Sequence, residues 1–305
     1  MLQRFALIAA TMAVASCASI LKEDGALAVV PYKTGSEGQI VVATRVNNEG
    51  PYSFAVDTGA SITVVLDETS RSAGLASLGG RGVSIQGMVA SGRFPLMTAR
   101  SLSVGGETWA NARVASIPGG TLAIDDIDGV LGLDFLARYS VGLSGDDGVL
   151  RLYPPALTEE RSYRGWVSLP LNRLRIGDTN AIAYTIDLTI GAETIPALFD
   201  LGATSNFMNW RAARSLDIRP LQPLRSATVA GALETAPVRA EVIVERVKTG
   251  SLHWRNRKFL VADYPVFDVF NLNGRPMAIV GTEIFGGRDL IIDFARSRLL
   301  VKTPG

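Results

Sequence analysis

The chain has 305 residues, which is enough for one large hydrophobic core or two medium ones and so for one or two domains. Hydrophobic residues make up 47% of the sequence and charged residues 19%, a composition that excludes an intrinsically disordered chain. The formal net charge is +1 and the basic residues form no stripe along the sequence, which argues against nucleic acid as a partner.

The first 17 residues have the layout of a secretory signal. Arg4 precedes an apolar run at residues 5–14, which is too short for a permanent membrane-spanning helix. Residues 14–17, Val-Ala-Ser-Cys, resemble the lipobox of bacterial lipoproteins, and this resemblance implies a lipid on Cys17, the only cysteine. We therefore expect a signal peptide over residues 1–17, export to the periplasm and a membrane anchor on Cys17. An ordinary signal peptide with an incidental Cys17 is the alternative.

Three segments are expected after the signal. Residues 18–32 are interpreted as a tether or a short pro-segment, without a feature that separates the two. A first lobe is predicted over residues 33–155 and a second over residues 156–305. The boundary is placed at residues 154–165, where two prolines and a charged stretch interrupt the strand pattern.

The first half begins with a predicted hairpin, in which strands 40–46 and 52–56 are joined by an Asn-Asn-Glu-Gly turn cluster. The second strand runs into Asp57-Thr58-Gly59-Ala60, and a short helix is predicted near residues 67–73. Further along, an apolar Val-Leu-Gly segment ends at Gly132. A second hairpin is predicted from strands 139–143 and 149–153.

The second half repeats this order. Strands 184–190 and 195–199 lead into Asp200-Leu201-Gly202-Ala203, a short helix is predicted near residues 210–216, and an Ile-Val-Gly segment ends at Gly281. Strands 289–294 and 299–302 form the last hairpin. The two aspartates are 143 residues apart, and each precedes its downstream glycine by a similar distance, 75 and 81 residues. Four matched features indicate a duplication.

Two Asp-x-Gly loops brought together by an approximate two-fold axis suit acid–base hydrolysis. Carboxylates a few ångströms apart cannot both ionise cheaply, so the pair shares one proton. The ionised member takes a proton from a water molecule, while the protonated member donates to the carbonyl oxygen of an amide. The chain has one histidine and one cysteine, too few for a typical zinc site, so neither a metal nor a cofactor is expected.

These motifs resemble the pepsin and retropepsin class of aspartic peptidases, especially bacterial retropepsin-like sequences fused in tandem. The resemblance covers nearly all of the chain after the signal. It implies a mostly β, bilobal acid-protease fold, with two pseudo-symmetric β-barrel-like lobes and short helices. It also implies that Asp57 and Asp200 are the catalytic pair and that Gly132 and Gly281 support their loops from beneath. The remaining loop residues by this resemblance are Thr58, Gly59, Ala60, Leu201, Gly202 and Ala203.

Two departures from the family pattern change the expected chemistry. Leu201 replaces the Thr or Ser of the second loop, so one of two reciprocal hydrogen bonds between the loops should be missing, at a cost of roughly 1 kcal/mol. Ala60 and Ala203 stand where pepsins carry a hydroxyl that favours the ionised carboxylate. We therefore predict a pH optimum in the weakly acidic to neutral range, less acidic than that of pepsin.

Two flaps are expected by the same analogy. The first is placed near residues 83–97, where Gly87 and Gly92 allow a tight hairpin, and the second near residues 228–238, with Gly231. Neither segment contains a tyrosine, so a pepsin-type flap tyrosine is missing.

The sequence thus predicts an aspartic-type endopeptidase that acts as a monomer on polypeptides outside the cytoplasm. The rival hypothesis is a catalytically silent, peptide-binding lipoprotein on the same fold, and Leu201 is the feature that favours it. A lesser rival is an enzyme specialised for one partner protein.

Overall fold

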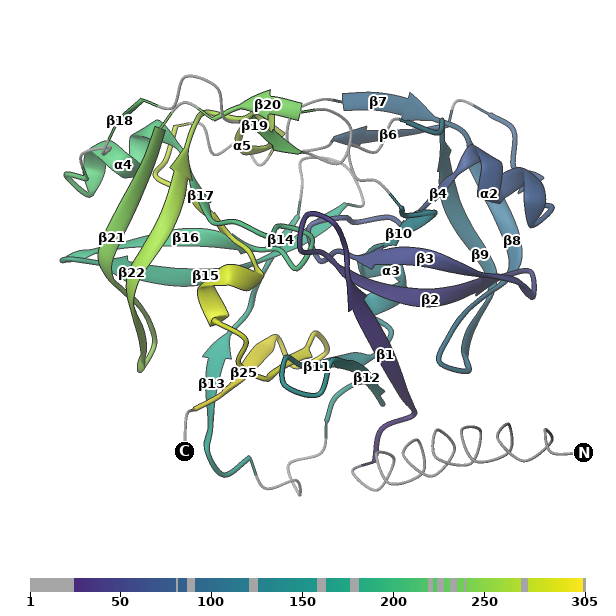
Figure 1. Ribbon diagram of the computed structural model, residues 1–305, viewed down its shortest axis with the longest axis horizontal. Helices are drawn as coiled ribbons and strands as arrows, with labels where there is room; N and C mark the ends of the chain where they lie inside the picture. The colour runs from purple at the N-terminus through teal and green to yellow at the C-terminus, as the bar shows by residue number, and fades with distance from the viewer. Residues whose placement is uncertain are drawn as a thin grey trace, which may run out of the picture.

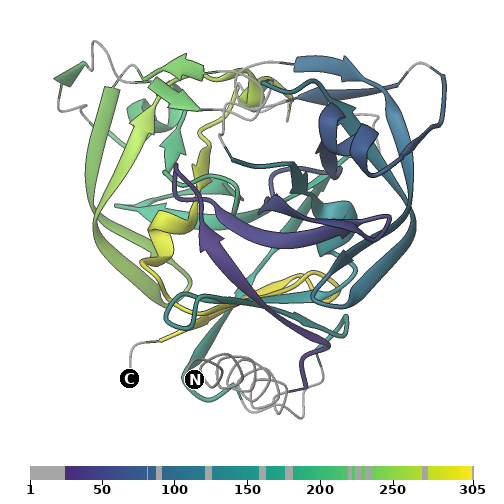
Figure 2. The same cartoon turned by 45° about the vertical axis from the view of Figure 1, so that its right-hand side comes forward.

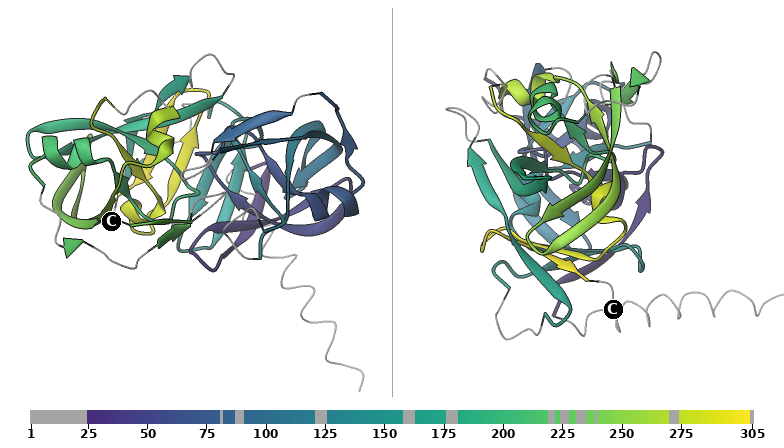
Figure 3. Two further views of the ribbon diagram at one scale, coloured as in Figure 1. Left: turned by 90° about the horizontal axis from the view of Figure 1, so that it is seen from above. Right: turned by 90° about the vertical axis from the view of Figure 1, so that its left-hand side faces the viewer.

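The computed structural model describes residues 25–80, 82–86, 91–120, 126–157, 163–175, 181–218, 222–223, 228–230, 235–238, 240–269 and 274–303. Strands dominate and the helices are short, as Figure 1 shows. Seen from above in Figure 3, the first half of the chain (purple to teal) and the second half (green to yellow) form two lobes side by side. The predicted mostly β, bilobal fold is confirmed.

The first lobe contains the elements that precede the predicted boundary. Its strands are β1 (Ala28–Thr34), β2 (Ile40–Val46), β3 (Glu49–Val56), β4 (Val64–Leu66), β5 (Ala76–Ser77), β6 (Val83–Gln86), β7 (Ser91–Phe94), β8 (Leu96–Val104), β9 (Glu107–Ile117), β10 (Gly129–Leu131), β11 (Ser140–Ser144) and β12 (Val149–Tyr153). Its helices are α2 (Asp67–Ser72) and α3 (Leu133–Leu136). Helix α2 carries an ion pair of 2.9 Å from Arg71 to Asp67, one turn apart on an exposed face.

The second lobe repeats the sequence of elements. Its strands are β13 (Trp166–Pro170), β14 (Asn172–Arg175), β15 (Ile182–Ile190), β16 (Glu193–Phe199), β17 (Phe207–Met208), β18 (Gln222–Pro223), β19 (Thr228–Ala230), β20 (Thr235–Pro237), β21 (Ala240–Thr249), β22 (Leu252–Val261), β23 (Ala278–Val280), β24 (Leu290–Asp293) and β25 (Arg298–Lys302). Its helices are α4 (Trp210–Ser215), α5 (Pro265–Val269) and the 3-10 helix η1 (Thr282–Phe285). Helix α4 begins at Asn209, whose side chain caps it by accepting from the Ala212 N–H.

The two lobes share one sheet beneath them. Strands β13, β25, β24, β11, β12 and β1 are neighbours in that order and all pair antiparallel, so three strands of the second half lie beside three strands of the first half. Figure 2 shows these strands crossing under both lobes. The sequence predicted the two hairpins β11–β12 and β24–β25, and the structure joins them edge to edge through β11 and β24.

Strand β1 begins inside the stretch that was interpreted as a tether or pro-segment, residues 18–32. Ala28 to Pro31 pair with β12, and Tyr32 to Thr34 pair with β2. Ala28 and Val30 are buried, which is the alternation expected of a strand with one face on a core. Residues 28–32 therefore belong to the folded body in this structure, and the first lobe begins earlier than residue 33.

The halves match in detail within the long hairpins β8–β9 and β21–β22. Leu102 opposes Trp109 in the first hairpin, and Val247 opposes Trp254 in the second. An arginine guanidinium lies over each indole: Arg138 at 5.5 Å from the Trp109 ring centre and Arg288 at 5.7 Å from that of Trp254. The duplication inferred from the loops therefore extends through each lobe.

The largest hydrophobic core runs through both lobes and the shared sheet. Its fully buried aromatic side chains include Phe54, Phe135, Phe199, Phe259 and Phe285. Burying a side chain of this size contributes roughly 1.5–3 kcal/mol, so the strands that carry the two aspartates are held firmly. Among the described residues, no helix is long and apolar enough to cross a bilayer.

Candidate active site

Each predicted catalytic aspartate follows the end of a buried strand. Asp57 comes directly after β3 and Asp200 after β16. The apolar-Gly segments pair with these strands in parallel, β10 with β3 and β23 with β16. The pairing continues into the loops, because Asp57 N–H donates to Leu131 O at 3.1 Å and Asp200 N–H donates to Val280 O at 3.0 Å.

The two aspartates face each other across the lobe boundary, and the loop glycines permit this approach. A Cβ at Gly59 would lie 2.6 Å from Asp200 Oδ2, and a Cβ at Gly202 would lie 2.5 Å from Asp57 Cγ. Any side chain at either glycine would displace the opposite carboxyl group. The glycine of each loop is therefore required by the carboxyl group of the other.

Backbone amides hold the carboxyl groups in place. Asp57 Oδ1 accepts from Gly59 N–H at 2.7 Å and from Ala60 N–H at 2.9 Å. Asp200 Oδ1 accepts from Gly202 N–H at 2.8 Å. Each aspartate thus has a fixed side-chain orientation within its own loop.

The pKa of Asp57 is raised by burial, and the hydrogen bond from Asp200 and those from its own loop oppose this rise. The pKa of Asp200 is raised well above its ordinary value, first by burial and then by the negative charge of Asp57 and the hydrogen bond to it. The two carboxyl groups therefore titrate as a pair that keeps a proton more readily than free aspartates do, with the stronger rise of the pKa at Asp200.

Thr58 bonds across the lobe boundary, and Leu201 does not return the bond with its side chain. Thr58 Oγ1 donates to Phe199 O at 3.0 Å and accepts from Leu201 N–H at 2.9 Å. Leu201 is 1% exposed and packs into the largest core. The second loop thus has a buried apolar side chain at the position of the hydroxyl. The reciprocal hydrogen bond is missing, as the sequence predicted.

A second hydroxyl of the first loop also reaches the other lobe. Ser61 Oγ donates to Ile182 O at 2.7 Å and accepts from Ile182 N–H at 3.2 Å, at the start of β15. The matching residue of the second lobe, Thr204, only contacts the first lobe, where a Cβ at Gly38 would lie 3.3 Å from Thr204 Cγ2.

Gly132 and Gly281 lie directly beneath the loops. A Cβ at Gly132 would be 2.6 Å from the backbone carbon of Ile62, and a Cβ at Gly281 would be 2.7 Å from that of Ala203. The residue after each glycine holds the loop from below: Leu133 N–H donates to Ala60 O at 2.8 Å, and Thr282 N–H donates to Ala203 O at 3.0 Å.

A buried polar pair supports the first loop and was missed in the sequence. Thr63 Oγ1 accepts from Gly132 N–H at 3.1 Å and donates to Asp134 Oδ1 at 2.6 Å. Burial raises the pKa of Asp134. In the second lobe Asn206 stands in the place of Thr63 and accepts from Gly281 N–H at 3.3 Å. The matched spacing of Thr63 and Asn206, each six residues after its aspartate, is the signal that could have revealed them.

Two hairpins stand where the flaps were expected. Strands β6 and β7 form a separate two-stranded sheet, and so do β19 and β20. Both lie along the upper edge in Figure 1, on the side away from the shared sheet. Phe94 of the first hairpin packs with Ala60 and Ile62 of the first aspartate loop around one hydrophobic cluster. Gly92 lies in β7, whereas Gly87 and Gly231 fall outside the described residues, as does Cys17.

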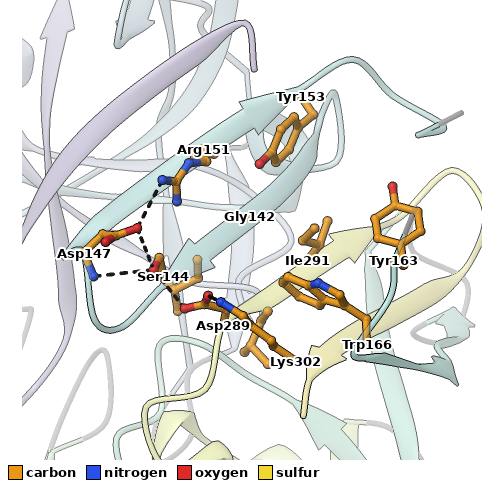
Figure 4. A pocket seen from close by; sticks show the side chains of 12 residues that line it. Gly142, Ser144, Asp147, Arg151, Tyr153, Tyr163, Trp166, Asp289, Ile291 and Lys302 are labelled. Carbon is orange, nitrogen blue, oxygen red and sulfur yellow. Dashed lines mark hydrogen bonds and ion pairs between the residues drawn. The ribbon is translucent and has the colours of Figure 1, made fainter. Parts of the chain in front are cut away.

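A cavity of about 270 Å³ lies elsewhere, on the shared sheet, and Figure 4 shows it from close by. None of its lining residues belongs to the two aspartate loops. Its charged side chains bond to one another: Lys302 Nζ donates to Asp289 at 2.9 Å, and Arg151 donates to Asp147 at 3.2 Å. We assign no part of the reaction to this cavity.

The fold and the facing Asp-x-Gly loops define a bilobal protein of the retropepsin-like kind. A family model described as aspartyl protease matches residues 42–135 and, a second time, residues 186–284. Each match contains one aspartate loop and the apolar-Gly segment beneath it. The chain therefore belongs to the aspartyl protease family, with the domain present twice in tandem. No curated protein sequence matches it.

Proposed function

We propose that the protein is an aspartic-type endopeptidase in which Asp57 and Asp200 act as one catalytic pair. The observation that carries this proposal is the reciprocal packing of each carboxyl group against the glycine of the opposite loop, and the raised pKa values of both groups agree with it.

In the proposed mechanism, ionised Asp57 removes a proton from a water molecule held between the carboxyl groups. The water oxygen attacks the carbonyl carbon of the peptide bond while protonated Asp200 donates its proton to the carbonyl oxygen. The tetrahedral intermediate then collapses: Asp57 gives its proton to the departing amine, and Asp200 recovers a proton from the diol. Both carboxyl groups return to their starting states, and the peptide bond is replaced by a carboxylic acid and an amine.

The proposed substrates are exported polypeptides bound in an extended form, whose backbones pair with the flap strands β6–β7 and β19–β20. We further propose that the protein acts as a monomer, because one chain supplies both aspartates. A lipid on Cys17 would hold it at a membrane facing the periplasm. Export and lipid attachment are proposed from the signal-like residues 1–17 and the Val-Ala-Ser-Cys motif at residues 14–17.

The test is cleavage of a diverse peptide mixture by a chain that begins at Ala18, across the pH range that spans aspartate titration, with cut ends read by mass spectrometry. Asp57→Ala and Asp200→Ala variants serve as controls. Cleavage that disappears in both variants supports the proposal. Cleavage that survives in either variant contradicts it.

A second candidate function is peptide binding without turnover. Leu201 favours it, because its side chain cannot return the hydrogen bonds that Thr58 makes to Phe199 O and Leu201 N–H of the second loop. Peptides that are retained by the protein and never cut at any pH would support this alternative.

A further inference from the structure

The outer face of the hairpin β21–β22 carries three basic side chains and a histidine at positions where its counterpart in the first lobe has neutral residues. Arg246 opposes Arg255, and Lys248 opposes His253, with all four side chains exposed. The matched pairs of β8–β9 are Ser101 with Ala110 and Ser103 with Thr108, all of them neutral. We call these four residues of β21–β22 the cationic face.

No partner within the described residues neutralises the cationic face. The ion pairs in that part of the chain involve none of Arg246, Lys248 and Arg255. Two arginines directly opposite each other on neighbouring strands repel and destabilise the hairpin. Glu245 is the nearest acidic residue along the strand, and it too is exposed and makes no ion pair there. The repulsion would be relieved by an external anion.

The cationic face lies near the turn of its hairpin, and this turn borders the shared sheet. A Cβ at Gly250 in the turn would lie 2.8 Å from Leu169 Cδ2 of β13. The turn of β8–β9 borders the same sheet at its other edge, where a Cβ at Gly105 would lie 2.9 Å from Ala28 Cβ at the start of β1. Figure 1 shows both hairpins pointing downward on the outer sides of the lobes, so their turns lie away from the flap hairpins.

The chain therefore enters the folded body at the underside of the first lobe, and the cationic face stands at the underside of the second. Seven residues lie between Cys17 and Gly25, the first described residue, and the eight steps from one to the other span at most about 28 Å when fully extended. If Cys17 carries a lipid, the shared sheet is held within that distance of the bilayer. A cationic face on the same underside of the molecule complements the anionic headgroups of such a surface.

We propose that the cationic face binds anionic phospholipid headgroups and thereby orients the protein on a membrane. The first lobe is attached through its N-terminal segment and the second through Arg246, Lys248 and Arg255, which places the flaps and the aspartate pair on the side away from the bilayer. Membrane attachment is commonly made of two signals, a lipid and a basic patch. This inference does not depend on peptidase activity.

The experiment is vesicle co-sedimentation with a chain that begins at Ala18, which keeps every described strand and helix. Residues 1–17 carry Arg4 as their only charged side chain, so this chain has equal numbers of basic and acidic residues. Binding to an anionic surface must then come from the arrangement of charges. We expect binding to vesicles of phosphatidylglycerol and phosphatidylcholine, and none to phosphatidylcholine alone.

The triple variant Arg246→Ser, Lys248→Ser, Arg255→Ala installs the residue types of the first-lobe hairpin. Each basic side chain near an anionic bilayer contributes about fivefold to partitioning, so the triple variant should bind at least about tenfold more weakly. The matched control removes three exposed cations of the first lobe, Arg45→Ser, Arg100→Ser and Arg113→Ala, and should change binding less than about threefold.

Equal losses in the two triple variants, or no preference for anionic vesicles, would overturn the proposal. Tighter binding to a nucleic acid or an acidic polypeptide than to the vesicles would overturn the choice of a membrane. Circular dichroism and melting curves of both variants confirm that the fold is kept. Peptide cleavage in solution should be the same in both, which separates this result from any failure of the proposed peptidase activity.

Discussion

The two aspartate loops share the Asp-x-Gly-Ala pattern but differ in their hydrogen bonds. The first loop sends two hydroxyls across the lobe boundary, Thr58 to Phe199 and Leu201, and Ser61 to Ile182. The second loop sends none, because Leu201 is apolar and Thr204 makes only a contact. Beneath the first loop, the Thr63 hydroxyl donates to Asp134. Beneath the second loop, the Asn206 side chain occupies the matching position and accepts from Gly281 N–H.

The duplicated halves therefore contribute differently to the structure of the site. The first lobe supplies the hydrogen bonds that join the loops, and the second supplies apolar packing around Leu201. The carboxyl groups differ as well: Asp57 Oδ1 accepts from Gly59 N–H and Ala60 N–H, whereas burial and the charge of Asp57 raise the pKa of Asp200 well above its ordinary value.

The largest effect is expected from Thr58→Val, which keeps the shape of the side chain and removes its hydroxyl. Phe199 O and Leu201 N–H would both lose their partner in a buried place, at a cost of roughly 2–4 kcal/mol in the free energy of unfolding. The looser loops should lower kcat by about tenfold or more. Urea unfolding and peptide cleavage measure the two quantities.

The control is Thr204→Val in the second loop, for which the described part of the chain offers no hydrogen-bond partner. It should change stability by less than about 0.5 kcal/mol. Equal losses of stability in the two variants would show that the hydrogen bonds of Thr58 do not distinguish the two loops.

The next effect is expected from Asp134→Ala, which takes away the acceptor of the Thr63 hydroxyl and of the Thr63 N–H. We expect a loss of roughly 1–3 kcal/mol in unfolding free energy together with a lower kcat. Asp134→Asn should restore most of both, since its amide oxygen still accepts these bonds.

Glu283→Ala tests the matched position of the second lobe, where Asn206 makes the bond to Gly281 without an acid. It should cost less than about 0.5 kcal/mol. A stronger effect at Glu283 than at Asp134 would contradict this difference between the two halves.

A smaller effect concerns stability and pH. The folded-state pKa of Asp200 is raised, mainly by burial and then by the charge of Asp57. The folded protein thus holds this proton more tightly than the unfolded chain does, so stability falls as pH rises from the unfolded pKa, about 3.9, through the folded pKa. Asp200→Asn removes this loss. Its Tm should exceed that of the parent at pH 7, by roughly 2–4 °C for each kcal/mol relieved, and equal it at acidic pH.

Calorimetry at the two pH values checks this expectation, with exposed Asp187→Asn as the control. A lower Tm of the Asp200→Asn variant at pH 7 would show that the carboxyl group is not strained by burial.

The smallest effect is expected from Leu201→Thr, which would make the loops symmetric. The gain of a reciprocal hydrogen bond and the loss of a buried leucine nearly cancel, leaving a net destabilisation of roughly 1 kcal/mol. kcat should be unchanged or rise by up to about fivefold as the pair is stiffened. A fall in kcat without loss of fold would show that the apolar side chain is needed.

Much of this arrangement could be predicted from the sequence. The repeated sequence pattern predicted the strands before each aspartate and the two glycine segments. It also predicted the flap hairpins and the missing hydroxyl at Leu201. These features are local, or they recur in both halves, so each half supports the interpretation of the other.

The rest depends on partners that are distant in the sequence. Asp134 lies in the first turn of a short helix, a position that favours an acidic side chain whatever it bonds to. Ser61 meets Ile182 across 121 residues, and β1 joins the shared sheet through strands at the end of the first lobe. Neither pairing has a periodic signal. The cationic face is also hidden, because it becomes visible only when the register of β21 and β22 is compared with that of β8 and β9.

Whether Asp57 and Asp200 act as a single unit is measured by comparing Asp57→Asn, Asp200→Asn and the double variant on one cleaved peptide. The effects of substituting groups that act as a unit do not add. Each single variant should therefore lose about a thousandfold or more in kcat/KM, and the double variant should lose no more than either single variant does. A single variant that keeps its activity, or losses that multiply in the double variant, would show that the two carboxyl groups do not act as one unit.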